Sequence, residues 1–251
     1  MTRIIIHGCS GAMGRVVSEL AQEMQDVQVL AGVDLNIDAV FDYPVFPSLD
    51  VCDVEADVVV DFASAKAVDH LLDFCADKRL GLVLCTTGLS EEQIKKAEAA
   101  AEKTAVLRSA NMSLGINTLF KLLREAAKVL AGAGFDIEVV EKHHNRKLDA
   151  PSGTALALAD SINEAMEHAY HYEYDRTERR ERRDPKEIGI HAVRGGTIVG
   201  EHEVIFAGQD EVVTFSHTAY SKAIFAKGAL EAARFLTGRK PGLYTMADVI
   251  G

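Results

Sequence analysis

Residues 141 to 155 carry the side chains best suited to acid–base chemistry in this chain of 251 residues. His143 and His144 are the side chains whose ordinary pKa lies nearest neutral pH, and Lys147 adds a fixed positive charge shortly after them. Together they predict a site that attracts an anion and protonates it. For the two histidines alone, the alternative is a structural pair beside a surface lysine.

A predicted helix start follows these side chains. The Pro-Ser-Gly-Thr sequence begins at Pro151, and the first N–H groups of a helix have no partner within that helix. Such groups bind a carboxylate or a phosphate. The candidate anion-binding residues are therefore Ser152, Gly153 and Thr154, and we expect their backbone N–H groups to be free.

A glycine-rich turn lies near the other end of the chain. Arg3 to His7 predicts a short apolar strand, and Gly8-Cys-Ser-Gly-Ala-Met-Gly14 leads from it into an amphipathic helix. In dinucleotide folds this order lets the backbone approach a pyrophosphate, and a second strand ends in an acid that binds the ribose. The candidate cofactor-binding residues here are Gly8, Cys9, Ser10, Gly11, Ala12, Met13 and Asp34. An unliganded turn is the alternative, because a tight turn favours glycine with or without a ligand.

Strands and helices alternate through the first half of the chain. Apolar runs predict strands over 27–33, 57–62, 80–85 and 105–109, with helices over 66–78 and 90–103 between them. Ser90-Glu-Glu-Gln93 is a capping box at the start of the last helix. The repeated β-α-β order predicts an α/β fold with a doubly wound parallel sheet of the Rossmann type, and ligands bind such sheets at the carboxyl ends of the strands.

The pattern changes after Ser113. Helices are predicted over 117–130 and 154–166, and strands near 135–139, 188–193, 197–206 and 212–217. This predicts an α+β domain whose sheet carries helices on one side only, so self-association through the other face is expected. We expect residues 1–114 to bind a dinucleotide, 115–222 to bind substrate and mediate oligomerisation, and 223–251 to return to the first domain.

Composition agrees with a soluble, cytoplasmic enzyme, and we expect neither a membrane span nor a signal peptide. A net charge of −11 argues against nucleic acid as a partner, so a cationic pocket must be built locally. The mixed-charge run 175–187 is interpreted as a solvated helix or loop, with a segment covering the substrate as the alternative. The cysteines are scattered and indicate reduced thiols, not a metal site or disulfides: Cys9, Cys52, Cys75 and Cys85.

The motifs resemble those of the 4-hydroxy-tetrahydrodipicolinate reductases, also called dihydrodipicolinate reductases, of lysine and diaminopimelate biosynthesis. The resemblance covers essentially the whole chain, and the combination of His-His, Lys and Pro-Ser-Gly-Thr-Ala is its most specific part. Besides Gly8 to Gly14 and the 141–155 segment, the matching sequences are Cys85-Thr-Thr-Gly88, Ser109-Ala-Asn-Met112, Arg194-Gly-Gly-Thr-Ile-Val-Gly-Glu-His202 and Gly242-Leu-Tyr-Thr-Met-Ala-Asp-Val.

The resemblance implies an NAD(P)H-dependent reductase that forms a homotetramer through the sheets of the second domain. It implies that His143 donates a proton, with Lys147 as second donor, after hydride transfer to a heterocyclic imine-dicarboxylate. The residues that it implies for the substrate carboxylates are His144, Ser152, Gly153 and Thr154. The further residues that it implies for the nicotinamide nucleotide are Cys85, Thr86, Thr87, Ala110, Asn111 and Met112.

Two positions depart from the commoner pattern of that family. Many relatives have an arginine directly after the acid that stands here as Asp34 and another shortly after the Asp-Phe pair at 61–62, whereas this chain has Leu35 and Ser64. Neither side chain can pair with a 2′-phosphate, and Asp34 would repel one, so NADH is expected to be the preferred cofactor, with NADPH possible. Lys66 lies nearby in the sequence and leaves the preference open.

Three other functions stay open at this point. A sugar or amino-acid dehydrogenase of the same two-domain plan would lack the Pro-Ser-Gly-Thr segment. A redox-sensing protein would usually add a basic DNA-binding element, which this sequence does not contain. A metallohydrolase using His143, His144 and Glu141 is the weakest alternative, because adjacent residues on a strand point to opposite faces.

Overall fold

The computed structural model describes residues 1–251, which divide into two compact units. Unit 1 consists of Met1–Leu114 and Ala223–Gly251, and unit 2 consists of Gly115–Lys222. The binding and oligomerisation roles expected for these units stay predictions. No helix combines the length and the apolar character needed to cross a membrane.

Unit 1 contains a seven-stranded sheet in which every neighbouring pair is parallel. In sheet order the strands are β12 (Gly242–Tyr244), β6 (Ala105–Arg108), β5 (Gly81–Leu84), β4 (Val58–Asp61), β1 (Thr2–His7), β2 (Val27–Val33) and β3 (Val45–Phe46). The chain leaves β1 in one direction to form β2 and then returns to the other side of β1 to form β4. The glycine-rich turn after β1 therefore lies where the strand order reverses, the place where such sheets bind ligands.

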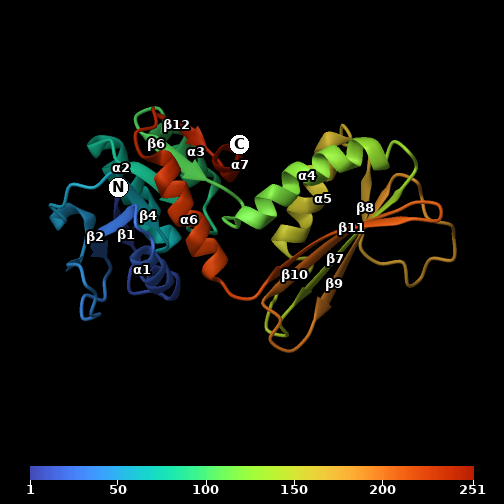
Figure 1. Ribbon diagram of the computed structural model, residues 1–251, viewed down its shortest axis with the longest axis horizontal. Helices are drawn as coiled ribbons and strands as arrows, with labels where there is room; N and C mark the ends of the chain where they lie inside the picture. The colour runs from blue at the N-terminus through green and yellow to red at the C-terminus, as the bar shows by residue number, and fades with distance from the viewer. The chain divides into compact units, whose positions relative to one another are not determined.

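Helices cover both faces of this sheet (Figure 1). One face packs against α1 (Ala12–Glu23) and α6 (Ala223–Leu236), and the other against α2 (Ala65–Lys78) and α3 (Glu91–Ala101). Consecutive residues of β1 alternate between the two cores, with Ile4 and Ile6 in the first and Ile5 in the second. The predicted doubly wound α/β fold is confirmed. The remaining short elements of unit 1 are η1 (Leu49–Val51) and α7 (Met246–Ile250).

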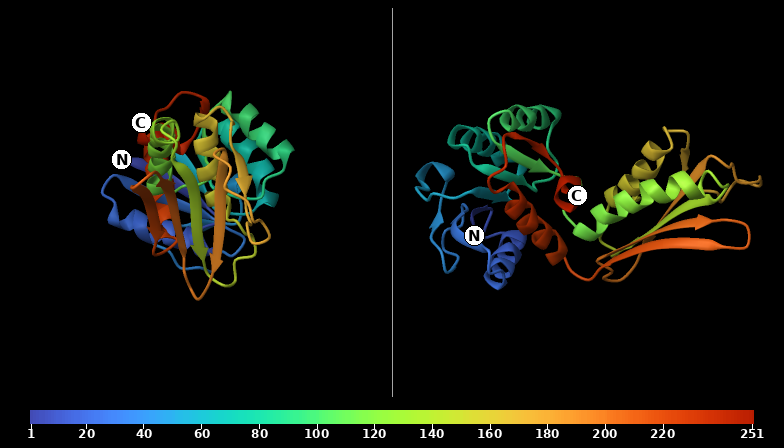
Figure 2. Two further views of the ribbon diagram at one scale, coloured as in Figure 1. Left: turned by 90° about the vertical axis from the view of Figure 1, so that its right-hand side faces the viewer. Right: turned by 45° about the horizontal axis from the view of Figure 1, so that its top comes forward.

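Unit 2 contains a mixed five-stranded sheet with both of its helices on one face (Figures 1 and 2). In sheet order the strands are β11 (Val212–Ala219), β10 (Gly200–Ala207), β7 (Asp136–His143), β9 (Glu187–Arg194) and β8 (His171–Glu173), and the helices are α4 (Leu114–Leu130) and α5 (Gly153–Ala165). Along β7, every second residue from Ile137 to His143 is buried. This alternation confirms the predicted α+β arrangement and places Glu141 and His143 on the helix-covered face.

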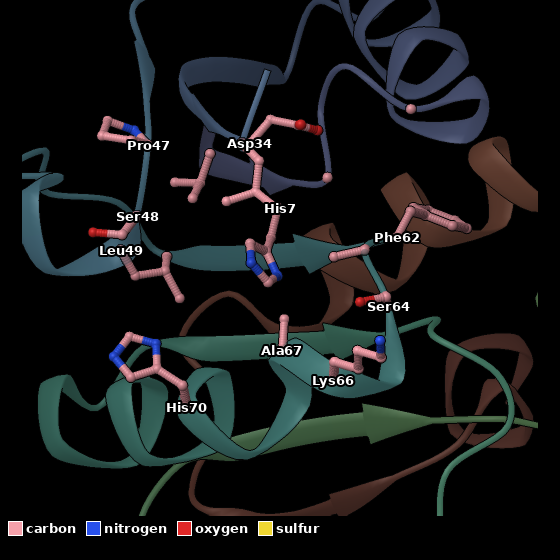
Figure 3. Close-up of a pocket in the computed structure, with 15 residues that line it drawn as sticks. His7, Asp34, Pro47, Ser48, Leu49, Phe62, Ser64, Lys66, Ala67 and His70 are labelled. Atoms are coloured by element: carbon pink, nitrogen blue, oxygen red, sulfur yellow. The ribbon is translucent and has the colours of Figure 1, made fainter. Parts of the chain in front are cut away.

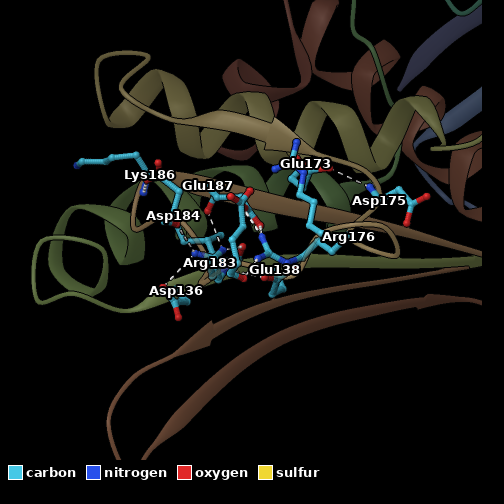
Figure 4. Close-up of polar contacts among 12 residues, drawn as sticks. Asp136, Glu138, Glu173, Asp175, Arg176, Arg183, Asp184, Lys186 and Glu187 are labelled. Atoms are coloured by element: carbon cyan, nitrogen blue, oxygen red, sulfur yellow. Dashed lines mark hydrogen bonds and ion pairs between the residues drawn. The ribbon is translucent and has the colours of Figure 1, made fainter.

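The charged run between β8 and β9 is irregular and contains no helix. Arg183 donates 2.7 Å hydrogen bonds to the carbonyls of Ile137 and Glu187, and its side chain also pairs with Asp136 and Glu138 (Figure 4). Arg176 pairs with the buried carboxylate of Glu187. The interpretation as a solvated segment is therefore incomplete, because two of its arginines hold the run against β7 and β9.

Candidate active site

The glycine-rich turn of unit 1 is shaped by close backbone approaches. Gly8 has a φ of +82°, and a Cβ added there would lie 2.8 Å from the backbone of Ala63. A Cβ on Gly14 would lie 2.2 Å from the carbonyl oxygen of Gly8, so neither position accepts a side chain without movement of the backbone. No side chain caps the start of α1, which leaves its first N–H groups for a ligand. These features fit the pyrophosphate of a dinucleotide.

A cavity of about 530 Å³ opens beside this turn, and Figure 3 shows the side chains around it. The structure brings Asp34, Leu35, Ser64 and Lys66 together in its lining. The carboxylate of Asp34 accepts hydrogen bonds of 3.0 Å from the backbone amides of Ser10 and Asn36. It is thereby held at the wall of the cavity, with further lone pairs for ribose hydroxyls.

Several predicted cofactor-binding residues have side chains that pack in the core or form hydrogen bonds within the protein. The side chains of Cys9 and Met112 are buried in the core, so only their backbone groups remain for a ligand. Asn111 accepts a 2.8 Å hydrogen bond from the amide of Ser113, and burial raises the pKa of the half-buried Cys85 thiol, which stays protonated. Thr87 and Ala110 are exposed beside them, at the ends of β5 and β6.

A buried histidine–carboxylate pair at the ends of β1 and β4 was not predicted. Nδ1 of His7 lies 2.7 Å from Oδ1 of Asp61, and the hydroxyl of Thr86 donates a 2.6 Å hydrogen bond to Oδ2. His7 and Asp61 are opposite each other in the register of the two strands. The Thr86 hydroxyl is thus fixed by the fold, which orients the loop that follows β5.

In unit 2 one carboxylate contacts several of the residues predicted to form the site. Glu141 is fully buried, and Nδ1 of His143 lies 2.6 Å from its Oε2. Arg194, from the neighbouring strand β9, donates a 2.7 Å hydrogen bond to each oxygen of this carboxylate. The backbone amide of Ser152 donates to Oε1 at 2.9 Å. Glu141 therefore joins the end of β7 to the start of α5.

The expectation of a free amide at Ser152 is wrong, because that amide is the one bound to Glu141. The Ser152 hydroxyl is also used, since it caps α5 by accepting a hydrogen bond from Ala155 and lies 3.1 Å from Nε2 of His202. A Cβ on Gly153 would meet no atom within 4 Å, so the space beside this residue is open. Gly153 and Thr154 remain as candidates for contact with an anion.

Positive charge collects around the loop between β7 and α5. Partial burial and the charges of Arg146, Lys147 and Lys222, among others, lower the pKa of His144, whose Nδ1 has no hydrogen-bond partner. Nζ of Lys147 lies 2.8 Å from the carboxylate of Asp149, and this hydrogen bond lowers the pKa of the Asp149 carboxyl. The loop is therefore a local cationic site in an acidic protein. No group of three or more His, Cys, Asp or Glu side chains is arranged to hold a metal ion.

Both parts of the chain match one protein family. Residues 2–112 match the profile described as dihydrodipicolinate reductase, N-terminus, and residues 115–250 match the profile described as dihydrodipicolinate reductase, C-terminus. The chain belongs to the dihydrodipicolinate reductase family. It is therefore an oxidoreductase of lysine and diaminopimelate biosynthesis, in a family that depends on a pyridine nucleotide.

Named relatives of this reductase match it from end to end. The 4-hydroxy-tetrahydrodipicolinate reductase of Caldanaerobacter subterraneus subsp. tengcongensis is 56% identical over 250 residues, which cover 100% of this chain and 98% of the relative. That of Clostridium novyi is 46% identical with the same coverage. A dipicolinate-bound dihydrodipicolinate reductase from Paenisporosarcina sp. TG-14 has a TM-score of 0.83 at 25% identity, with 100% of each chain covered.

More distant structures share the fold alone. A myo-inositol dehydrogenase from Corynebacterium glutamicum has a TM-score of 0.56 at 14% identity over 100% of this chain and 92% of its own. Family membership decides against the sugar or amino-acid dehydrogenase, the redox sensor and the metallohydrolase considered from the sequence.

Acid should destabilise the reductase through His202. Burial, with repulsion from a protonated His143, lowers the pKa of His202 to about 4, whereas an unfolded histidine titrates near 6.5. The unfolded chain therefore takes up the proton first as the pH falls. The stabilisation from neutral His202 is complete above about pH 6.5 and is lost as the pH falls toward 4, by about 2 kcal/mol at pH 5.

Urea unfolding at pH 7.5 and pH 5 measures this effect. His202→Gln should lose less unfolding free energy between the two pH values than the unaltered protein does. The exposed His171→Gln is the control and should lose as much as the unaltered protein. Equal losses in His202→Gln and the unaltered protein would contradict the assignment.

Proposed function

We propose that this chain reduces 4-hydroxy-tetrahydrodipicolinate to tetrahydrodipicolinate, using NADH in preference to NADPH. The observation that carries the proposal is the shared carboxylate of Glu141, which binds both His143 and the amide of Ser152. A proton donor and an anion-binding helix start are thereby held side by side in unit 2. Loss of water from the 4-hydroxy compound, followed by addition of one hydride and one proton, gives the product.

His143 is the proton donor of the proposal. Its Nδ1 is engaged by Glu141, so Nε2 is the atom left to give a proton to the reduced ring. Lys147 is the second donor and stabilises negative charge on the substrate. Since Asp149 forms an ion pair with Lys147, a substrate carboxylate must share or replace that ion pair.

The substrate carboxylates are proposed to bind at the start of α5. We assign the contacts with these carboxylates to His144, Gly153 and Thr154. Ser152 holds the start of the helix in place, because its amide donates to Glu141 and its hydroxyl accepts from the amide of Ala155. Dipicolinate, named with the Paenisporosarcina structure, is a heterocyclic dicarboxylate of the same kind as the proposed substrate. A dianion here would also offset the positive charges that lower the pKa of His144.

Unit 1 is proposed to hold the nicotinamide nucleotide, which supplies the hydride when bound. The turn from Gly8 to Met13 and the start of α1 would hold the pyrophosphate, and Asp34 the ribose hydroxyls. The loops after β5 and β6, which include Cys85 to Thr87 and Ala110 to Met112, would contact the nicotinamide half. The hydrogen bonds of Thr86 to Asp61 and of the Ser113 amide to Asn111, which hold side chains of these loops in place, support that proposal.

A spectrophotometric assay tests the function as a whole. The chain should oxidise NADH when 4-hydroxy-tetrahydrodipicolinate is generated freshly in the cuvette, and dipicolinate should inhibit the reaction. Oxidation without that substrate, or none in its presence, would contradict the proposal.

Thr154→Val should raise KM for the substrate about tenfold while kcat changes less. A hydroxyl that donates to a carboxylate contributes about 1.5 to 3 kcal/mol, and the backbone amide of Gly153 remains in the variant. Steady-state kinetics with varied substrate gives both constants. Thr177→Val, in the charged run before β9, is the control and should change neither. An unaltered KM in Thr154→Val would move the carboxylate site elsewhere.

We also propose self-association through the helix-free face of the unit 2 sheet, in a homotetramer. Val140 and Ile205 are half-buried on this face among charged neighbours that are paired, such as Lys142 with Glu201 and Glu203. Paired charges and apolar side chains are compatible with a protein interface. Sedimentation velocity gives the assembly directly.

A further inference from the structure

Glu141 is a fully buried carboxylate with four hydrogen-bond donors. They are Nδ1 of His143 at 2.6 Å, the amide of Ser152 at 2.9 Å, and two guanidinium nitrogens of Arg194 at 2.7 Å. Burial alone would raise the pKa of Glu141, but the hydrogen bonds from Arg194, His143 and Ser152 outweigh it and the pKa lies below its ordinary value. The carboxylate is therefore charged at neutral pH.

An ionised carboxylate can only accept hydrogen bonds. Nδ1 of His143 must then carry a proton whether the ring is neutral or positively charged, and Nε2 is the only ring atom that can exchange one. Gly200, the first residue of β10, leaves space beside it, since a Cβ at that position would lie 3.1 Å from Nε2.

We propose that Glu141 is a positioning residue that fixes the Nδ1–H tautomer of His143 and so makes Nε2 the proton-donating atom. Arg194 serves this arrangement by holding both carboxylate oxygens. The proposal rests on the proposed function, in which His143 is the proton donor. It adds that the direction of proton transfer is set by a side chain that does not touch the substrate.

Glu141→Gln should reverse the tautomer without removing the side chain. The amide has one oxygen and one NH₂ group. If its oxygen takes the place of Oε1, it keeps both the Ser152 amide and one nitrogen of Arg194 as donors, and the NH₂ group faces His143 and only one donor, the other guanidinium nitrogen of Arg194. The opposite orientation sets the NH₂ group against two donors, so the first is favoured. Nδ1 of His143 must then accept, and the proton moves to Nε2.

A matched control lies on the same strand. Glu138 of β7 accepts hydrogen bonds from Nε of Arg183 at 2.9 Å and lies 2.8 Å from Nε2 of His191. It thus repeats the pairing of a glutamate with an arginine and a histidine, on the opposite face of the sheet, and Figure 4 shows its side chain beside Arg183. Glu138→Gln changes the same functional group without altering the surroundings of His143.

Nitrogen NMR of the full chain labelled with ¹⁵N-histidine reads the tautomer directly. At about pH 9, well above the ordinary histidine pKa, His143 should carry its proton on Nδ1 in the unaltered protein and on Nε2 in Glu141→Gln. kcat should fall about tenfold in that variant with the Kd for NADH unchanged, because an NH₂ group facing Nδ1 cannot accept a hydrogen bond from the doubly protonated ring, the form from which Nε2 gives up its proton, whereas cofactor binding does not involve this ring. Glu138→Gln should keep both the Nδ1–H tautomer of His143 and the normal kcat.

Two results would overturn the inference. One is an Nε2–H tautomer of His143 in the unaltered protein, a measurement that needs no variant to fold. The other is a folded Glu141→Gln protein whose His143 tautomer and kcat are both unchanged. The proposed function fails separately, through a normal kcat in His143→Ala, because the tautomer of His143 is measured without turnover.

Discussion

We expect His143→Ala to lower kcat by on the order of 10²-fold or more, the usual effect of removing a general acid. Lys147→Ala should have an effect of similar size, because it removes a donor and a positive charge next to the anionic substrate. Binding of NADH to the free protein should change little in either variant, since both residues belong to unit 2. Stopped-flow turnover and fluorescence titration with NADH separate the two quantities.

His191→Ala is the control for the histidine. His191 also pairs with a glutamate, but on the other face of the sheet, so its loss should leave kcat within about twofold of the normal value. Asp149→Asn is the control for Lys147→Ala, because this substitution breaks the ion pair of Lys147 but leaves the lysine side chain in place. A near-normal kcat in His143→Ala or Lys147→Ala would mean that the residue does not have the role proposed for it.

The second large effect concerns the cofactor. The unaltered protein should prefer NADH by about tenfold in kcat/KM, because Asp34 accepts hydrogen bonds from ribose hydroxyls but repels a 2′-phosphate. Leu35→Arg combined with Ser64→Arg should shift the ratio toward NADPH by about 10²-fold, since each new charge-assisted pair contributes about a factor of ten or more. Both positions line the cavity that holds Asp34, and Leu35 is 94% exposed.

Kinetics with each cofactor at saturating substrate give this ratio. Val129→Arg, at an exposed apolar position on α4, adds charge in unit 2 and should leave the ratio unchanged. Lys66 also lines the cavity. Equal use of NADH and NADPH by the unaltered protein would mean that Lys66 or another cation binds the 2′-phosphate of NADPH. A preference for NADPH would contradict the role proposed for Asp34.

Local patterns predicted the larger elements well. The strand over 27–33 has the expected bounds, and both hydrogen bonds of the capping box between Ser90 and Gln93 are present at 3.2 Å. These elements could be predicted because their signals lie in neighbouring residues: a run of β-branched side chains for the strand, and the spacing of the capping residues for the helix. The strands β3, β8 and β12 have only two or three residues each, too few for a periodic pattern, and were not predicted.

One strand begins later than expected. The sequence pattern started it at Thr197, but β10 begins at Gly200. The residues before it are used otherwise, because the amide of Gly195 donates to the carbonyl of His143 and the carbonyl of Gly196 accepts from Asn145. The two glycines thus fix the loop after β7 and do not extend the sheet.

The surroundings of His143 could not be predicted from one sequence. Glu141, Arg194 and His202 come from β7, β9 and β10, and they meet only because of the order and register of these strands. The residue types were visible, but a carboxylate buried under an arginine looks in the sequence like any polar residue on an exposed face. For the same reason, the sequence did not predict that the Ser152 amide donates its hydrogen bond to Glu141.

The discontinuity of unit 1 bears on how the protein is made. Strands β1 to β6 and helices α1 to α3 are synthesised before unit 2, but α6 and β12, which complete one core and one sheet edge, are synthesised after it. Ala229, Leu230 and Ala233 of α6 are fully buried against strands made more than a hundred residues earlier. Domains generally fold as units during synthesis, the N-terminal one first. In this chain the order is reversed: unit 2 has its whole sequence while the nucleotide fold still exposes an apolar face that only α6 can cover.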